Sequence, residues 1–142
     1  MAEISTNIIL DGITLALRAE FPDSHIESNA VEQGLNEPAF IVLLVNAEAS
    51  EYPARRKKRL PRFDVIYFPK AGNEECYDVA DTLFEVLEVI DLPGGDKLRG
   101  MDMSFQVEDR VLHFLVSYRH FTYKEEEVVK METLEINQEG GN

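Results

Sequence analysis

The sequence feature that most constrains the fold is an apolar strand followed closely by an amphipathic helix, over residues 62–90. In the peptide RFDVIYFP, the side chains of Phe63, Val65 and Tyr67 fall on one face of an extended chain. Pro69 has no N–H to donate to a continuing ladder, so the strand is expected to stop there. Such a strand needs a second layer to cover its apolar face.

The helix over residues 74–90 (EECYDVADTLFEVLEVI) supplies that layer, because its two sides differ sharply in polarity. One side is an apolar stripe at helical spacing: Cys76, Ala80, Leu83, Phe84, Leu87 and Ile90. The other side is acidic and contains no basic residue: Glu74, Asp78, Asp81, Glu85 and Glu88. Asn73 is expected to cap the helix, with the first acids near the positive end of its dipole.

The remaining elements complete a domain of the α+β class. We expect a helix over residues 7–20, an edge strand over 25–31, a central strand over 39–45 covered on both faces, and strands over 98–108 and 111–123. The predicted order is α-β-β-β-α-β-β, an antiparallel or mixed sheet with two helices packed on it. Residues 1–124 form this single domain, and residues 125–142 form an acidic C-terminal arm.

The composition restricts the classes of partner. The chain has 27 acidic and 14 basic residues, and its formal net charge of −13 opposes general affinity for nucleic acid. No apolar run approaches the roughly 20 residues that span a membrane. The segment MAEISTNIIL lacks the basic start of a signal peptide, so no membrane association is expected.

The positive charge is concentrated in one short stretch, unlike the negative charge. Six basic residues lie within eight positions: Arg55, Arg56, Lys57, Lys58, Arg59 and Arg62. Because residues 46–54 are polar and turn-prone, the run is expected at the end of a loop between two strands, where its charges contribute little to folding.

Three interpretations of this basic loop remain open. It is a solvated loop that protects the neighbouring strand from aggregation, a nucleic-acid patch, or a docking loop for an acidic protein. A nucleic-acid patch favours interleaved aromatic residues, and only Tyr52 is near. An acidic neighbour fits better, and the helix face with Glu74, Asp78 and Asp81 on the next subunit is one candidate.

The sequence predicts no catalytic, cofactor or metal site. None of the three histidines, His25, His113 and His120, has a second ligand at metal-binding spacing. Cys76 is the only cysteine, so no intramolecular disulfide forms, and its place on the apolar stripe makes it a poor nucleophile. A single cysteine is consistent with a reducing cytoplasm.

Several peptides, in matching order over residues 8–124, resemble the tail terminator family of long-tailed bacteriophages. They are VEQGLNEPAFIV, RFDVIYFP, NEECYDVADTLFEVLE and LRGMDMSFQVEDRVLHFLVSY, and the turn residues Glu32-Gln33-Gly34, Glu37-Pro38, Tyr67-Phe68-Pro69 and Arg99-Gly100 are the most specific. The resemblance implies a non-enzymatic structural protein. It implies a homohexameric ring that caps the tail tube, ends its polymerisation and joins it to the neck or head.

The partners that this resemblance implies are further copies of the chain, the tail tube protein, a neck or head-completion protein, and the sheath protein if the tail is contractile. DNA is implied only as passing cargo, and the implied location is the tail of a virion or of a phage-derived particle, assembled in the host cytoplasm. The alternative is a small regulatory nucleic-acid-binding module that uses residues 55–62. An enzyme ranks third, because no residue pattern supports one.

Overall fold

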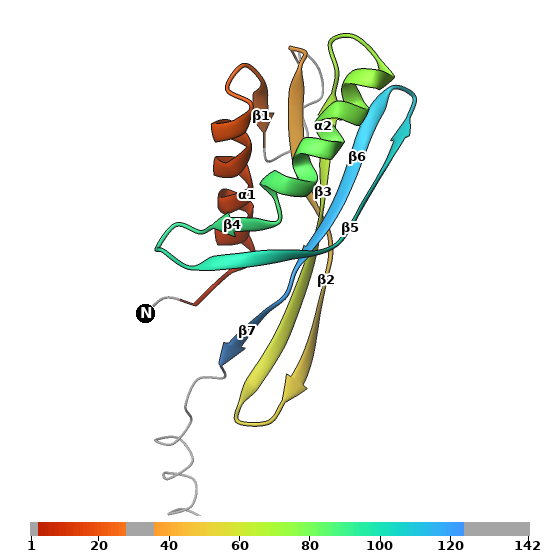
Figure 1. Ribbon diagram of the computed structural model, residues 1–142. Helices are drawn as coiled ribbons and strands as arrows, with labels where there is room; N and C mark the ends of the chain where they lie inside the picture. Colours follow the sequence, from red (N-terminus) through yellow and green to blue (C-terminus); the bar gives the residue numbers. More distant parts are fainter. Residues whose placement is uncertain (1–2, 28–35, 124–142) are drawn as a thin grey trace, which may run out of the picture.

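The computed structural model describes residues 3–27 and 36–123, which form two helices and a curved sheet (Figure 1). The elements are α1 (Thr6–Glu20), β1 (His25–Glu27), β2 (Ala39–Tyr52), β3 (Arg56–Phe68), α2 (Asn73–Val86), β4 (Val89–Asp91), β5 (Lys97–Glu108), β6 (Val111–Tyr118) and β7 (His120–Tyr123). Among the described residues, neither helix is long and apolar enough to cross a membrane.

The sheet is mixed, as expected. Its strand order is β1-β2-β3-β6-β5-β4, and β7 pairs with β3 outside this path. Only β1 and β2 are parallel, and the other pairs are antiparallel. The α+β class and the order of the long elements are therefore confirmed. The short strands β4 and β7 are additions to the predicted order. The predicted arm over residues 125–142, and the expected edge strand beyond Glu27, lie outside the described residues.

Both helices pack on one face of the sheet, because their apolar stripes meet the same alternate strand residues. From α1 and α2 the core takes Ile9, Ile13, Leu17, Cys76, Ala80 and Leu83, and from the strands it takes Phe40, Val42, Phe63, Val65, Tyr67, Leu112, Phe114 and Val116. Alternation along β3 and β6 thus predicted the covered face correctly.

The apolar run in β2 is less buried than the sequence indicated. Residues 39–42 are buried, but Leu44 and Val45 are 47% and 54% exposed. The register of β2 on β3 shifts between Leu44 and Asn46, which marks a bulge. The prediction of a strand covered on both faces is therefore wrong beyond Val42.

The two ends of α2 also differ from the prediction. The N-cap is Gly72 rather than Asn73 and has no side-chain cap, and the Glu75 carboxylate instead accepts hydrogen bonds from the backbone N–H groups of Lys70 and Ala71. The helix ends at Val86, so its predicted last residues form β4, which pairs with β5. Ile90 stays in the core although it belongs to a strand.

The largest correction concerns residues 46–59, which were expected to be a loop. They form a long β2–β3 hairpin in unbroken register from the pair Asn46–Arg62 to the pair Tyr52–Arg56. Only residues 53–55 turn, and Ala54 and Arg55 have positive φ angles of 67° and 62°. Polar strand residues resemble loop residues in a sequence, because a solvated ribbon has no apolar face to reveal its period.

The strand expected over residues 111–123 is interrupted at Arg119. Its two parts, β6 and β7, keep the same register on β3, from the pair Arg62–Ser117 to the pair Arg59–His120. Pro61 lies between these pairs and offers no N–H to the ladder, which accounts for the break.

Candidate functional site: a basic ribbon and an acidic helix

The basic run lies on the middle strand of a three-stranded ribbon that extends away from the two helices (Figure 1). The ribbon consists of residues 46–52 of β2, 56–62 of β3 and 120–123 of β7, and we call it the basic ribbon. Since β3 is paired on both sides, its cations are held on an ordered backbone. Arg55 alone of the run lies in the hairpin turn.

Strand pairing sorts the basic side chains onto two faces. Arg56 pairs with Tyr52 of β2, and Lys58 pairs with Phe121 of β7. Residues paired across antiparallel strands share a face, and so do residues two apart on one strand. These two cations and two aromatic residues therefore share one surface, which we call the aromatic face.

The aromatic face holds Arg56 between two rings. The Arg56 guanidinium carbon lies 4.8 Å from the ring centroid of Phe121 and 5.7 Å from that of Tyr52. Lys58 Nζ lies 5.7 Å from the Tyr52 centroid, and the two rings meet edge to face at 5.4 Å. Arg56 Nε also donates to the Pro53 carbonyl at 3.3 Å. Ring contacts of this kind fix the guanidinium while its charge remains.

The opposite face carries Lys57 and Arg59 beside buried β7 residues. His120, which pairs with Arg59, is only 6% exposed, and Thr122, which pairs with Lys57, is 8% exposed. Burial lowers the pKa of His120, and the nearby Arg59 lowers it further. This face therefore differs from the aromatic face in having no aromatic contact to its cations among the described residues.

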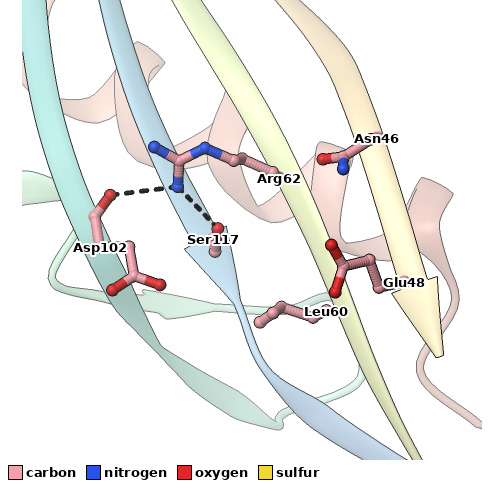
Figure 2. Close-up of a pocket in the computed structure, with 6 residues that line it drawn as sticks. All are labelled: Asn46, Glu48, Leu60, Arg62, Asp102 and Ser117. Carbon is pink, nitrogen blue, oxygen red and sulfur yellow. Dashed lines mark hydrogen bonds between the residues drawn. The ribbon is translucent and has the colours of Figure 1, made fainter. Parts of the chain in front are cut away.

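Arg62 has a different role from the rest of the run. Its Nη1 donates to Ser117 Oγ at 2.9 Å and to the Asp102 carbonyl at 3.1 Å, beside a surface hollow that Glu48 also lines (Figure 2). Asp102 has a positive φ of 52° where the β5–β6 register shifts. Arg62 thus secures the irregular part of β5.

The acidic side of α2 is exposed as expected. Glu74, Asp78, Asp81 and Glu85 form what we call the acidic stripe, and Tyr77 is 47% exposed beside it. Successive acids are three or four positions apart, so like charges are neighbours. Neither a basic residue in the last turn nor one within the stripe offsets them.

One chain does not bring the basic ribbon and the acidic stripe together. The basic residues lie at the start of β3, whereas α2 follows the other end of that strand (Figure 1). The 13 residues of β3 extend roughly 40 Å at the usual rise of a strand. The two charged surfaces are therefore at opposite ends of the subunit.

His113 and Cys76 are among the residues that the sequence offers for chemistry. Among the described residues, no three His, Cys, Asp or Glu side chains are placed to hold a metal ion. Asp64 Oδ2 lies 2.9 Å from His113 Nδ1, on the sheet face opposite the helices. Cys76 is fully buried, and burial raises the pKa of its thiol, which disfavours the reactive thiolate.

Sequence reasoning missed Phe121 and the contacts that Tyr52 makes with it. With Tyr52 as the single aromatic residue near the basic run, the sequence disfavoured an aromatic patch. The pairing of β7 with β3 supplies the second ring. The only local signal is the polar stretch before Pro53, which is about as long as the basic stretch after it. That symmetry fits a hairpin, but no local pattern indicates that β7 joins it.

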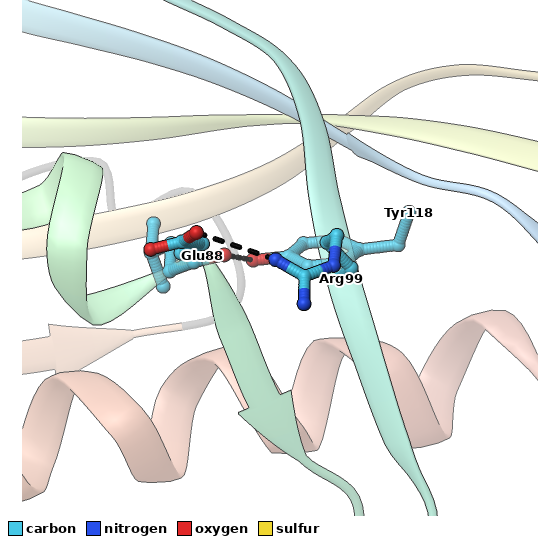
Figure 3. Close-up of polar contacts among 4 residues, drawn as sticks. Glu88, Arg99 and Tyr118 are labelled. Carbon is cyan, nitrogen blue, oxygen red and sulfur yellow. Dashed lines mark hydrogen bonds and ion pairs between the residues drawn. The ribbon is translucent and has the colours of Figure 1, made fainter.

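The peptide Arg99-Gly100 forms a joint between α2 and the sheet. Tyr118 donates to the Leu87 carbonyl at 2.7 Å, and Arg99 lies 3.3 Å from the Glu88 carboxylate (Figure 3). A Cβ on Gly100 would lie 2.6 Å from the same Leu87 oxygen. Only glycine allows this close approach, which explains why this position of β5 is occupied by Gly100.

Comparisons with known proteins bear on these features together. A family model described as phage tail terminator protein matches residues 8–130, which is most of the chain and includes β1 to β7. No curated protein matches the chain. The matched region contains the joint at Gly100, the basic ribbon and the acidic stripe. The chain therefore belongs to the phage tail terminator family, a family of structural proteins of the bacteriophage tail.

Proposed function

We propose that this protein assembles as a ring on the end of the finished tail tube, stops tube polymerisation and provides the joint to the neck or head. If the tail is contractile, the ring also meets the last sheath ring. The observation that carries the proposal is the family match over residues 8–130. Assembly takes place in the host cytoplasm, and the product is part of the virion tail.

Unpaired strand edges support assembly with further copies. On its outer side β2 is paired by β1 only over Ala39–Ile41, so the rest of its edge has no partner among the described strands. The outer side of β5 is paired by β4 only over Lys97–Arg99. Exposed edges favour pairing with another chain, and contacts between two different surfaces can close into a ring.

The exposed apolar residues on the β2 edge support the same proposal. Leu44 and Val45 lie at the bulge and are 47% and 54% exposed. A subunit contact there would remove both side chains from water. The bulge also bends the strand, which gives that edge a distinct shape for recognition.

The net charge suits a ring through which DNA passes. A formal charge of −13 repels phosphate, so an acidic lining would let DNA move without adhering. The tube protein, a neck or head-completion protein and, in a contractile tail, the sheath protein are the proposed partners. DNA itself is cargo in this proposal.

A second candidate function, a nucleic-acid-binding module, is favoured by one observation. Tyr52 and Phe121 lie beside Arg56 and Lys58, and aromatic rings next to cations are typical of single-strand binding. In this protein Arg56 already occupies the space near both rings, which leaves less ring surface for a base. A gel-shift assay with single-stranded DNA at physiological salt separates the two functions, since tight binding would favour the module.

The assembly proposal is tested by native mass spectrometry of the protein with and without purified tail tubes. We expect a species at a multiple of the subunit mass on tubes, and electron micrographs should place it at tube ends. If the protein stays monomeric at saturating concentration in the presence of tubes, the ring proposal is wrong.

A further inference from the structure

The aromatic face of the basic ribbon holds a guanidinium in place, as a binding surface for a carboxylate would require. Arg56 is oriented by Phe121, Tyr52 and the Pro53 carbonyl, so it loses little further freedom when it binds. A guanidinium presents several N–H donors in one plane, which matches the two oxygens of a carboxylate. Lys58 adds a second cation on the same face.

The acidic stripe of α2 offers complementary chemistry. Glu74, Asp78 and Asp81 are exposed at helical spacing, and none of them has a basic partner in the ion pairs of the described residues. Tyr77 is 47% exposed beside them, so the stripe also presents an aromatic ring that a partner could contact. A surface with cations and aromatic rings would neutralise this charge and cover this ring.

The separation of the two surfaces excludes contact within one subunit and allows contact between subunits. The basic ribbon lies at the start of β3 and α2 begins after its other end, and the 13 residues of β3 extend roughly 40 Å at the rise of an extended strand. Two different, complementary surfaces at opposite ends of one molecule produce a head-to-tail contact, which repeats from copy to copy. A closed ring needs a contact of this class.

We propose that the aromatic face, through Arg56 and Lys58, docks on the acidic stripe of α2 in a neighbouring copy of the chain. The inference rests on the ring assembly proposed above and names the surfaces that hold it. Arg56 is the anchor and takes a carboxylate of Asp78 or Asp81, while Tyr52 and Phe121 pack near Tyr77 and exclude water. Screening by salt weakens the contact.

The first experiment removes charge from each face of the same ribbon. The variant Arg56→Gln with Lys58→Gln alters the aromatic face, and Lys57→Gln with Arg59→Gln is the control with an equal charge change on the opposite face. Self-association is measured by sedimentation velocity with and without tail tubes, and folding by thermal unfolding. We expect association at least about tenfold weaker for the first variant, and within about threefold of wild type for the control.

The second experiment exchanges the charges. Arg56→Asp with Lys58→Glu places acids on the ribbon, and Asp78→Arg with Asp81→Lys places cations on α2. Each double variant should fail to associate, because like charges then face each other at the contact. The chain with all four substitutions should recover association, since the charges are complementary again.

The outcomes separate this inference from the proposed function. If the four-substitution chain associates no better than either double variant, the surfaces do not meet and the inference is wrong. If only the ribbon variants lose association with tubes, the acidic partner is a tube protein, which also overturns a contact between copies. In both cases wild-type capping of tubes would continue, whereas failure of wild type to cap tubes would overturn the proposed function.

Discussion

Individual side chains hold both ends of α2. At its start the Glu75 carboxylate accepts hydrogen bonds from Tyr67 and from two backbone N–H groups before the helix. At its end the Leu87 carbonyl accepts from Tyr118 at 2.7 Å. Each bond spans from the helix to the sheet or the turn before it, so it fixes the angle at which α2 crosses the strands.

The Glu75 contacts predict a pH dependence of stability. Burial favours the neutral acid, but the hydrogen bonds from Tyr67, Ala71 and Lys70 outweigh it and lower the pKa of Glu75 below 4.5. The stabilisation is therefore fully present above pH 4.5 and is lost as the pH falls through the folded-state pKa. Urea unfolding should show that Glu75→Gln loses less stability than wild type between neutral pH and about pH 3. Equal losses would contradict this account.

The Tyr118 contact predicts a cost for removing one hydroxyl. Tyr118→Phe leaves the buried Leu87 carbonyl without this donor and should lower the free energy of unfolding by about 1–3 kcal/mol. Tyr77→Phe is the matched control, because Tyr77 is 47% exposed and its change should stay within about 0.5 kcal/mol. Equal effects in denaturant titrations would show that the hydroxyl contributes nothing specific.

At the scale of elements, the sequence predicts well which faces of helices and strands are buried, and predicts poorly how solvent-exposed strands pair. The core faces of β3, β6 and both helices followed from spacing, because residues such as Phe63, Leu83 and Phe114 repeat with the period of their element. The basic ribbon did not follow, because its two hairpin strands are mostly polar and its third strand pairs with residues more than 60 positions earlier in the chain. The end of α2 at Val86 lies next to the close approach of Gly100 to the Leu87 carbonyl, a nonlocal contact that no local pattern reveals.

In the candidate site, too, some features could be predicted from the sequence and others depend on nonlocal strand pairing. The charges of the basic run and the acidic stripe are visible in the sequence, and the structure places the stripe on the exposed side of α2 as expected. That Arg62 turns to Ser117 and the Asp102 carbonyl, and that Arg56 meets Phe121, depends on nonlocal strand pairing. The sequence therefore predicts which residues carry charge, but not which contacts their side chains make.

The ribbon geometry changes the expected effect of the basic run on folding. In a loop these charges would contribute little, whereas Arg56 in the ribbon packs against two rings. Arg56→Ala should therefore lower the free energy of unfolding by about 1 kcal/mol. Lys57→Ala, on the other face, should cost less than about 0.5 kcal/mol. Chemical denaturation of both variants checks the difference, and equal costs would mean that the rings do not hold Arg56.

The whole molecule is an acidic body with its positive charge gathered at one end. Six of its 14 basic residues lie between Arg55 and Arg62, and the net charge is −13. We therefore expect copies to repel one another unless the basic ribbon of one faces acids of another. This asymmetry favours head-to-tail assembly over random association.

Salt should weaken that assembly without unfolding the subunit. The screening length falls from about 10 Å at 0.1 M salt to about 3 Å at 1 M, so attraction between the charged surfaces decreases. The apolar core is insensitive to such screening. Sedimentation and circular dichroism on the same samples should show smaller assemblies with unchanged secondary structure. Assemblies that keep their size at 1 M salt would contradict an electrostatic contact.

The measurement that tests the central claim most directly is tube elongation in the presence of this protein. Preformed tail tubes are incubated with it, fluorescently labelled tube subunits are added, and growth at each end is counted in micrographs. The account predicts that growth stops at the capped end, and that a ring of this protein is visible there. Continued growth at the same rate from ends saturated with the protein would contradict the claim that it terminates the tube.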